Sequence, residues 1–78
     1  ARPPEAAPPP HPHVGPLPHR ELDVLAEMAK GKPNKEIAAD LYVSLTTVKK
    51  HVTHIFDKLG VTNRTAAVAH ARHLGLVD

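Results

Sequence analysis

The chain of 78 residues contains no cysteine, so neither a disulfide framework nor a thiolate metal cluster stabilises it, and a reducing compartment suits it. No apolar run approaches the roughly 18 residues that a membrane-spanning helix needs. The first residues also lack the apolar stretch of a signal peptide. The length allows one small domain, which excludes a large enzyme built around an enclosed pocket.

Proline is concentrated at one end, with eight of the nine prolines in residues 1–18. Each proline removes a backbone donor and restricts the preceding residue to extended conformations, so this segment forms neither helix nor sheet. We expect residues 1–16 to be a proline-rich disordered linker or tail, and residues 17–78 to form the domain. A ligand for SH3-like partners is the alternative, but no flanking basic anchor frames the segment. Because the sequence starts with Ala1, we also expect it to be part of a longer protein.

From residue 17 onward the apolar residues recur with the period of an α-helix, and no strand pattern is present. The periodicity predicts an all-α fold with helices at about residues 19–30, 34–42, 45–59 and 63–74. In the first helix an apolar inner face is expected from Leu22, Leu25, Met28 and Ala29. The charged residues of that helix are expected largely opposite: Glu21, Asp23, Glu27 and Lys30.

Glycines and small polar residues mark the predicted helix ends. Gly31 and Gly60 suit the left-handed conformation that ends the first and third helices. Ser44 is the expected N-cap of the third helix, while Asn34 is either the N-cap or a first-turn residue of the second. A gap of only about three residues between the second and third helices predicts a steep crossing, as in a helix-turn-helix. The fold expected is a four-helix bundle with this motif at its centre.

The third predicted helix has two unlike faces. Its apolar stripe comprises Val48, Val52, Ile55 and Leu59, and the fourth helix is expected to turn Ala67, Val68, Ala71 and Leu74 inward. The opposite face presents Thr46, Lys49, Lys50, Thr53 and Asp57. An α-helix fits the major groove of B-DNA, and lysines without an acidic partner one turn away can meet phosphates or guanine O6 and N7. The alternative is an ordinary solvated, mildly basic helix face.

Other positive and polar groups lie near this face. Thr46 and Thr47 occupy the first turn, where hydroxyls, backbone N–H groups and the helix dipole suit a phosphate. Lys35 at the start of the second helix and Arg64 at the start of the fourth add positive charge. These residues therefore extend the candidate surface for a DNA backbone.

Five stretches occur in a characteristic order: residues 20–25 (RELDVL), 29–38 (AKGKPNKEIA), 44–51 (SLTTVKKH), 58–61 (KLGV) and 63–65 (NRT). Together they make residues 17–77 resemble the LuxR-type (GerE-like) DNA-binding domain of bacterial transcription regulators. The resemblance departs from the family at Pro18, where a capping threonine is usual, and loss of such a cap costs about 1 kcal/mol. Pro33 also replaces a frequent serine.

The resemblance implies sequence-specific binding of double-stranded DNA by the C-terminal effector domain of a bacterial regulator, with the third helix in the major groove. It implies base contacts from Lys49, Lys50 and Thr53. Contacts to the DNA backbone are expected from Lys35, Thr46, Thr47, Lys58 and Arg64. A dimer surface is expected at Ala66, Ala69 and His70. The implied partners are duplex DNA, a second copy of the chain and RNA polymerase, in the bacterial cytoplasm near the nucleoid and not at a membrane.

Three other functions compete with DNA binding. His51 and His54, like His70 and His73, are i, i+3 pairs, but a metal site needs three or four ligands, so neither a metal nor another cofactor is expected. Ser44 has no base at useful spacing, so the domain is not expected to be an enzyme. A helical protein–protein interaction module is the remaining alternative. It would have no reason to keep the third helix polar and cationic.

Overall fold

Residues 17–78, the part of the chain that the computed structural model describes, form four α-helices. They are α1 (His19–Ala29), α2 (Asn34–Leu41), α3 (Leu45–Leu59) and α4 (Arg64–His73). The predicted all-α class and helix order are confirmed, with every boundary within one residue of the prediction. The linker predicted for residues 1–16 lies outside the described residues. No helix in the described range is long and apolar enough to cross a bilayer.

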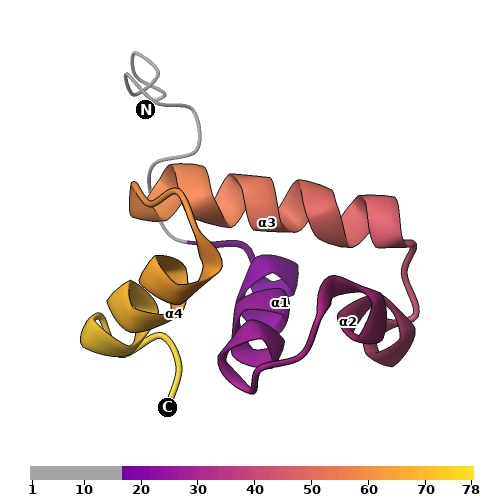
Figure 1. The fold of residues 1–78 in the computed structure, drawn as a ribbon, viewed down its shortest axis with the longest axis horizontal. Helices are drawn as coiled ribbons and strands as arrows, with labels where there is room; N and C mark the ends of the chain where they lie inside the picture. Colours follow the sequence, from indigo (N-terminus) through magenta and orange to yellow (C-terminus); the bar gives the residue numbers. More distant parts are fainter. Residues whose placement is uncertain (1–16) are drawn as a thin grey trace, which may run out of the picture.

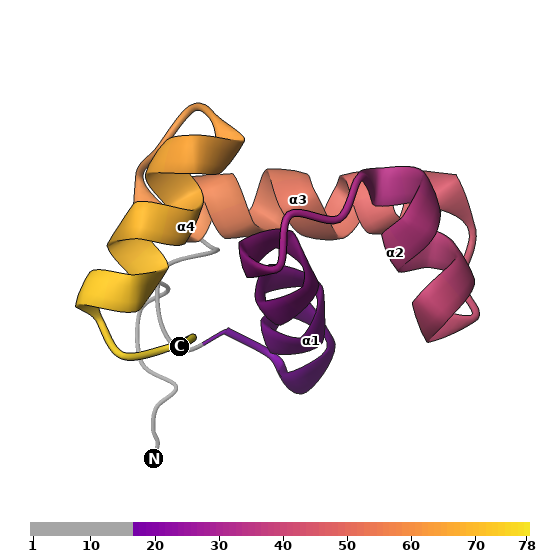
Figure 2. The ribbon, with the colours of Figure 1, turned by 60° about the horizontal axis from the view of Figure 1, so that its bottom comes forward.

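The longest helix, α3, organises the others. It lies along one side of the molecule with α1, α2 and α4 on its other side (Figures 1 and 2). It packs against each of them, and α1 also packs against α2 and α4. Within residues 17–78, α2 and α4 do not pack against each other. The helix-turn-helix formed by α2 and α3 therefore rests on α1, while α4 supports the other end of α3.

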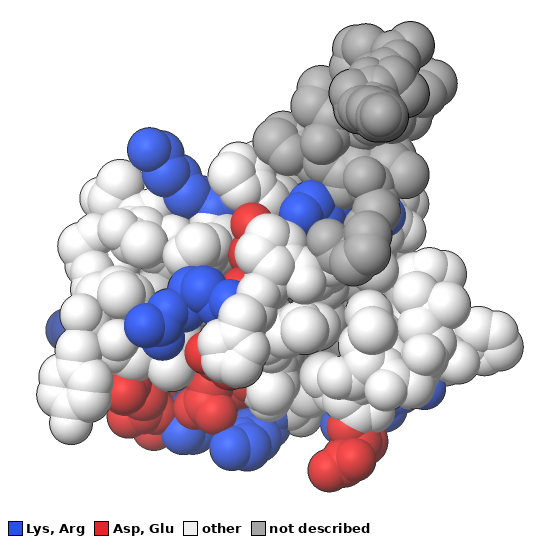
Figure 3. Space-filling view, turned by 180° about the vertical axis from the view of Figure 1, so that it is seen from behind, with Lys and Arg blue, Asp and Glu red and all other residues white. Residues whose placement is uncertain are grey.

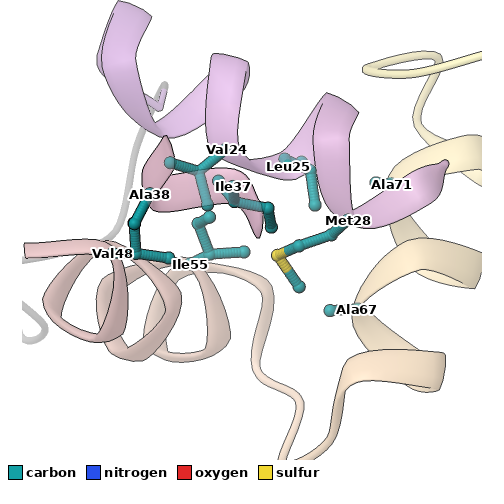
Figure 4. Packing of buried hydrophobic residues seen from close by; sticks show 9 residues of the cluster. All are labelled: Val24, Leu25, Met28, Ile37, Ala38, Val48, Ile55, Ala67 and Ala71. Atoms are coloured by element: carbon teal, nitrogen blue, oxygen red, sulfur yellow. The ribbon is translucent and has the colours of Figure 1, made fainter. Parts of the chain in front are cut away.

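The core lies where the helices meet, and every helix contributes to it (Figure 4). Its buried apolar residues are Val24, Leu25, Met28, Ile37, Ala38, Val48, Ile55, Ala67 and Ala71. The largest side chains that are fully buried include Leu25, Ile37 and Ile55, one from each of α1, α2 and α3. Because α4 contributes only alanines to the fully buried set, its backbone approaches the core closely.

Two details of the predicted core were wrong. In α1 the structure buries Val24 and leaves Leu22 and Ala29 only half-buried, because α1 is covered by three helices over a wider arc than a single stripe. In α4, Leu74 was expected to point inward but is 52% exposed. It is the C-cap residue, one position past the last helical turn.

The helix ends follow the expected chemistry where the sequence supplies a cap. Ser44 Oγ accepts the backbone N–H of Thr47 at 3.0 Å, as predicted, and Asn63 Oδ1 accepts that of Ala66 at 2.8 Å. Gly60 ends α3 in the left-handed region with φ 68°. Asn34 is the first residue of α2 and not its cap. No side chain of residues 17–78 caps α1 or α2, which begin after Pro18 and Pro33.

The turn between α2 and α3 contains a strained residue. Tyr42 ends α2 with φ 59° and ψ 42°, and it is the sole non-glycine residue with positive φ in the described range. The backbone N–H of Val43 donates to the carbonyl of Ala38 at 3.0 Å and closes the turn. An L-residue in this region loses roughly 1–2 kcal/mol to contacts between its Cβ and the backbone. Since Tyr42 is 94% exposed, burial offsets little of this cost.

Replacing Tyr42 with asparagine should therefore stabilise the domain by about 1 kcal/mol, because asparagine tolerates the left-handed region. Urea denaturation followed by circular dichroism would measure the free energy of unfolding. Tyr42→Phe, which keeps the ring and the strain, should leave it unchanged. A Tyr42→Asn variant less stable than the original chain would show that the ring makes a stabilising contact.

Candidate nucleic-acid interface

The face of α3 turned away from the other helices is polar and basic. Its side chains are all exposed, as predicted: Thr46, Lys49, Lys50, Thr53 and Asp57. Val48 and Ile55 lie on the opposite face, with no exposed surface. Within residues 17–78 neither lysine ammonium takes part in an ion pair or a hydrogen bond. Both are therefore available to an external anion.

The surrounding surface has an uneven distribution of charge. Figure 3 shows Lys and Arg side chains projecting from the half of the molecule that contains α2 and the start of α3. Acidic side chains lie mainly along the lower edge of this view, away from α3, where basic side chains also lie, and in the middle of the face. The first turn of α3 carries no acidic residue. The exposed start of α3 is thus a positive surface.

Local hydrogen bonds fix the threonines of α3. Ser44 Oγ and Thr47 Oγ1 lie 2.9 Å apart, so Thr47 shares in the cap and holds the first turn. Thr53 Oγ1 donates to the carbonyl of Lys49 at 3.0 Å, which leaves its oxygen lone pairs as acceptors. Thr46 lies exposed in the turn that the cap fixes. A ligand would therefore meet pre-positioned hydroxyl groups at both ends of the lysine pair.

A buried carboxylate holds α3 against α1. Glu21 was predicted to lie on the exposed side of α1, and this was wrong, because the residue is only 4% exposed. Its Oε2 accepts a hydrogen bond from His54 Nδ1 at 3.1 Å and lies 3.8 Å from His51 Nδ1. Its Oε1 lies 3.3 Å from Lys58 Nζ. The hydrogen bond from His54 and the nearby ammonium of Lys58 offset part of the cost of removing the carboxylate from water, whereas Glu21 Oε1 and His51 Nδ1 have no hydrogen-bond partner among the described residues.

This cluster includes Lys58, which is predicted to contact DNA, and the histidines of the metal-site alternative. The Lys58 side chain is 11% exposed and its ammonium faces Glu21, so the predicted contact of Lys58 with a DNA backbone stays a prediction. His51 is half-buried beside Glu21, so its ring belongs to the packing of α3 against α1. Among residues 17–78, no group of three or more His, Asp and Glu side chains could hold a metal ion.

The start of α2 presents Lys35, which is exposed in a first turn without a side-chain cap. Arg64, by contrast, is half-buried and donates three hydrogen bonds to the segment preceding Lys35, namely to Asn34 Oδ1 and to the carbonyl of Lys32. Its predicted backbone contact therefore also stays a prediction.

Lys32 is paired with two carboxylates. Its Nζ lies 2.6 Å from Asp40 Oδ2 and 2.6 Å from Glu27 Oε1. The hydrogen bond to Asp40, followed by that to Glu27, raises the pKa of Lys32 above its ordinary value. The hydrogen bonds from Lys32 and then Lys30 lower the pKa of Glu27. Lys32 is thus occupied within the domain, unlike Lys35.

The predicted dimer residues lie together on α4. Ala69 and His70 are exposed and Ala66 is half-buried, while Ala67 and Ala71 of the same helix face the core. Small side chains on the outer face allow another backbone to approach closely. The structure therefore brings the three residues to one accessible surface, and their role in dimerisation stays a prediction.

Comparison with known proteins identifies the domain. Residues 15–71 match the family model described as bacterial regulatory proteins, luxR family. The chain belongs to the luxR family. This confirms the LuxR-type resemblance, and because that family comprises DNA-binding regulators without catalytic activity, it also agrees with the expectation that the domain is not an enzyme.

Individual luxR-family relatives share both sequence and fold with the chain. It is 45% identical over 67 residues to the transcriptional regulatory protein LiaR of Bacillus subtilis (strain 168), covering 80% of the chain and 32% of LiaR. It is 54% identical over 55 residues to the uncharacterized transcriptional regulatory protein YhcZ of the same organism, covering 70% of the chain and 26% of YhcZ. The chain therefore spans a third or less of these relatives.

A solved structure supports the same assignment. The crystal structure of the response regulator ChrA from a heme-sensing two-component system superposes with a TM-score of 0.77 at 45% identity. The match covers 80% of this chain and 31% of ChrA. The described helices are therefore the helix-turn-helix domain found in luxR-family response regulators.

Glu21→Gln should destabilise the domain by about 3 kcal/mol, because it leaves the nearly buried Lys58 without its counter-charge. Asp23→Asn is the matched control on the same helix. Asp23 pairs with Arg20 at 3.8 Å between exposed side chains, so its loss should cost less than about 1 kcal/mol. Thermal and urea unfolding would measure both variants. Equal effects of the two variants would contradict the central role assigned to Glu21.

Proposed function

We propose that this domain binds double-stranded DNA sequence-specifically, with α3 in the major groove, as the C-terminal effector domain of a bacterial transcription regulator. One observation carries the proposal: Lys49 and Lys50 are exposed and unpaired among the described residues, on a helix whose other face is packed into the core. The site of action is the cytoplasm, at the nucleoid. RNA polymerase is the further partner of such a regulator at a promoter.

Base recognition falls to the exposed face of α3. Lysine reaches guanine O6 and N7 in the major groove, and a threonine hydroxyl or methyl group can contact several bases. We assign these contacts to Lys49, Lys50 and Thr53, which lie within about one helical turn of each other. Because Thr53 already donates to the carbonyl of Lys49, it acts toward DNA as an acceptor or through its methyl group.

Phosphate contacts fix the position of the domain along the DNA duplex. Lys35 lies at the start of α2, and Thr46 and Thr47 lie at the start of α3, where backbone N–H groups and the helix dipole attract an anion. We also assign weaker phosphate contacts to Lys58 and Arg64, because N–H groups of both side chains already contact oxygen atoms of the domain. These contacts fix orientation but carry no sequence information.

A dimer supplies the area of contact with DNA that sequence-specific binding needs. A domain of about this size covers only one half-site, and two-fold dimers commonly bind half-sites about one helical turn apart. We place the dimer surface on the outer face of α4, at Ala66, Ala69 and His70. An inverted repeat in DNA is then the matching target.

Lys49→Ala and Lys50→Ala should each weaken binding to the selected operator by about 1–3 kcal/mol, with a smaller effect on random duplex. Lys35→Ala should weaken binding to both duplexes equally and reduce the slope of log K against log salt by about 0.9. Lys30→Ala, which removes an exposed lysine already paired with Glu27, is the control. Fluorescence anisotropy at several salt concentrations would measure these effects. A DNA affinity that does not change with salt concentration would instead favour a protein–protein interaction module.

Ala69→Arg should reduce affinity for an inverted repeat to the level of a single half-site, because a long charged side chain blocks close approach of two copies of α4. Ala69 is exposed, so the fold should be unaffected, and Ala69→Ser serves as the conservative control. Footprinting and gel-shift titration on paired and single half-sites would measure the difference. If the unaltered chain binds one half-site as tightly as the pair, the dimer is contradicted.

A further inference from the structure

The connection between α1 and α2 is held from two sides by side chains of other elements. On one side, Lys32 Nζ contacts Glu27 of α1 and Asp40 of α2, each at 2.6 Å. On the other side, the carbonyl of Lys32 accepts a hydrogen bond from Arg64 Nη2 at 2.8 Å. The path of the chain into α2 is thus tied to α1, to α2 itself and to α4.

Arg64 makes two of its three hydrogen bonds to the first residue of α2. Its Nη1 and Nη2 both donate to Asn34 Oδ1, each at 3.0 Å. Asn34 is therefore occupied by Arg64 and does not cap its own helix. Arg64 is itself fixed, because the Asn63 cap holds the first turn of α4. Two helix starts that are 30 residues apart in sequence are joined by one guanidinium.

The bridge matters because it is the one hydrogen-bonded connection shown between these two helices among the described residues. The backbones of α2 and α4 do not pack against each other. Figure 2 shows the connection between α1 and α2 crossing in front of α3, in the space between α4 and α2. The guanidinium of Arg64 spans this region through side-chain contacts.

We propose that Arg64 is a positioning residue, which sets the start of α2 and thereby places Lys35 for its contact with a DNA phosphate. The inference rests on the proposed function, because it assigns Arg64 a role in the same interface. Lys35 follows Asn34 directly and is exposed, so the orientation of Asn34 determines where its side chain begins. Arg64 then contributes to DNA affinity mainly through Lys35, in addition to the weaker phosphate contact proposed above.

The chemistry of the bridge requires arginine. A planar guanidinium can donate to the Asn34 oxygen and the Lys32 carbonyl at once, whereas a lysine ammonium is a point charge on a flexible stem. Three of the N–H donors of Arg64 are used within the domain, and the residue is half-buried. A positioning role and a direct phosphate contact therefore predict different results for Arg64→Lys.

A double-mutant cycle on random-sequence duplex tests the inference. In the otherwise unaltered chain, Lys35→Ala should weaken binding about tenfold, the size of a good charged contact. In the Arg64→Gln background the same change should cost less than about twofold, because Lys35 is already misplaced. Arg72→Gln is the matched control. Arg72 also lies on α4 and carries the same charge, but it bonds to the carbonyls of Asp78 and Ala29. In that background the full effect of Lys35→Ala should remain.

Three further variants separate positioning from charge and from stability. Arg64→Lys keeps the charge but should still make the effect of Lys35→Ala on DNA affinity small. Asn34→Ala, which removes no charge, should have the same result. Lys49→Ala, measured on the selected operator, should keep its full effect in every background, which a general loss of stability would not allow. Each variant is assayed at a temperature where circular dichroism shows it fully folded.

Amide hydrogen exchange supplies a readout without DNA. The N–H groups of Glu36 and Ile37, which donate to the carbonyl of Pro33, should exchange faster in Arg64→Gln than in Arg72→Gln. Three results would each overturn the inference. They are an unchanged exchange rate in Arg64→Gln, additive effects of Lys35→Ala and Arg64→Gln on DNA affinity, and an unchanged DNA affinity of Arg64→Lys. If Lys35→Ala has no effect even in the unaltered chain, the proposed phosphate contact of Lys35 fails, and the positioning role fails with it.

Discussion

The buried carboxylate of Glu21 is the contact on which the arrangement of this domain depends. A carboxylate with only 4% exposure must be matched by donors, and α3 supplies them from His54 and Lys58, with His51 close by. These residues all lie on the side of α3 that faces α1. The ion pair therefore fixes the rotation of α3 about its own axis, which turns Lys49 and Lys50 outward. An apolar contact alone would leave that rotation less specified, because the burial of apolar surface is not directional.

Such a constraint is important in a domain with a small core. Domains of about 60 residues bury only about 60% of the surface that their unfolded chains expose, so their stability is marginal. Here two helices begin without a side-chain cap, and Tyr42 adopts a strained backbone conformation. Side-chain bridges between elements compensate for these losses. Glu21 joins α1 to α3, Lys32 joins α1 to α2, and Arg64 joins α4 to the start of α2.

Local features of the sequence were sufficient to predict the helices and the polar face of α3. The period of the apolar residues, the Ser44 cap and Gly60 each act within one or two turns of the chain, so their effect can be deduced without knowing the fold. The burial of Glu21 was missed because its position near the start of α1 suggested a surface charge interacting with the helix dipole. Its spacing with Leu25 and Met28, at i, i+4 and i+7, was the available signal. The bond between Arg64 and Asn34 had no such signal, because only the packing of the helices brings these residues together.

Six positive residues of the domain therefore fall into two groups, which net charge alone does not distinguish. Lys32, Lys58 and Arg64 have their donors directed at carboxylates or carbonyls of the domain itself. Lys35, Lys49 and Lys50 are exposed and lie at the starts of the two helices of the helix-turn-helix. The internal group sets the positions of these helices, and the exposed group remains available to DNA. A modest formal charge of +2 is then compatible with DNA binding, because what matters is that the unpaired charges share one rigidly held surface.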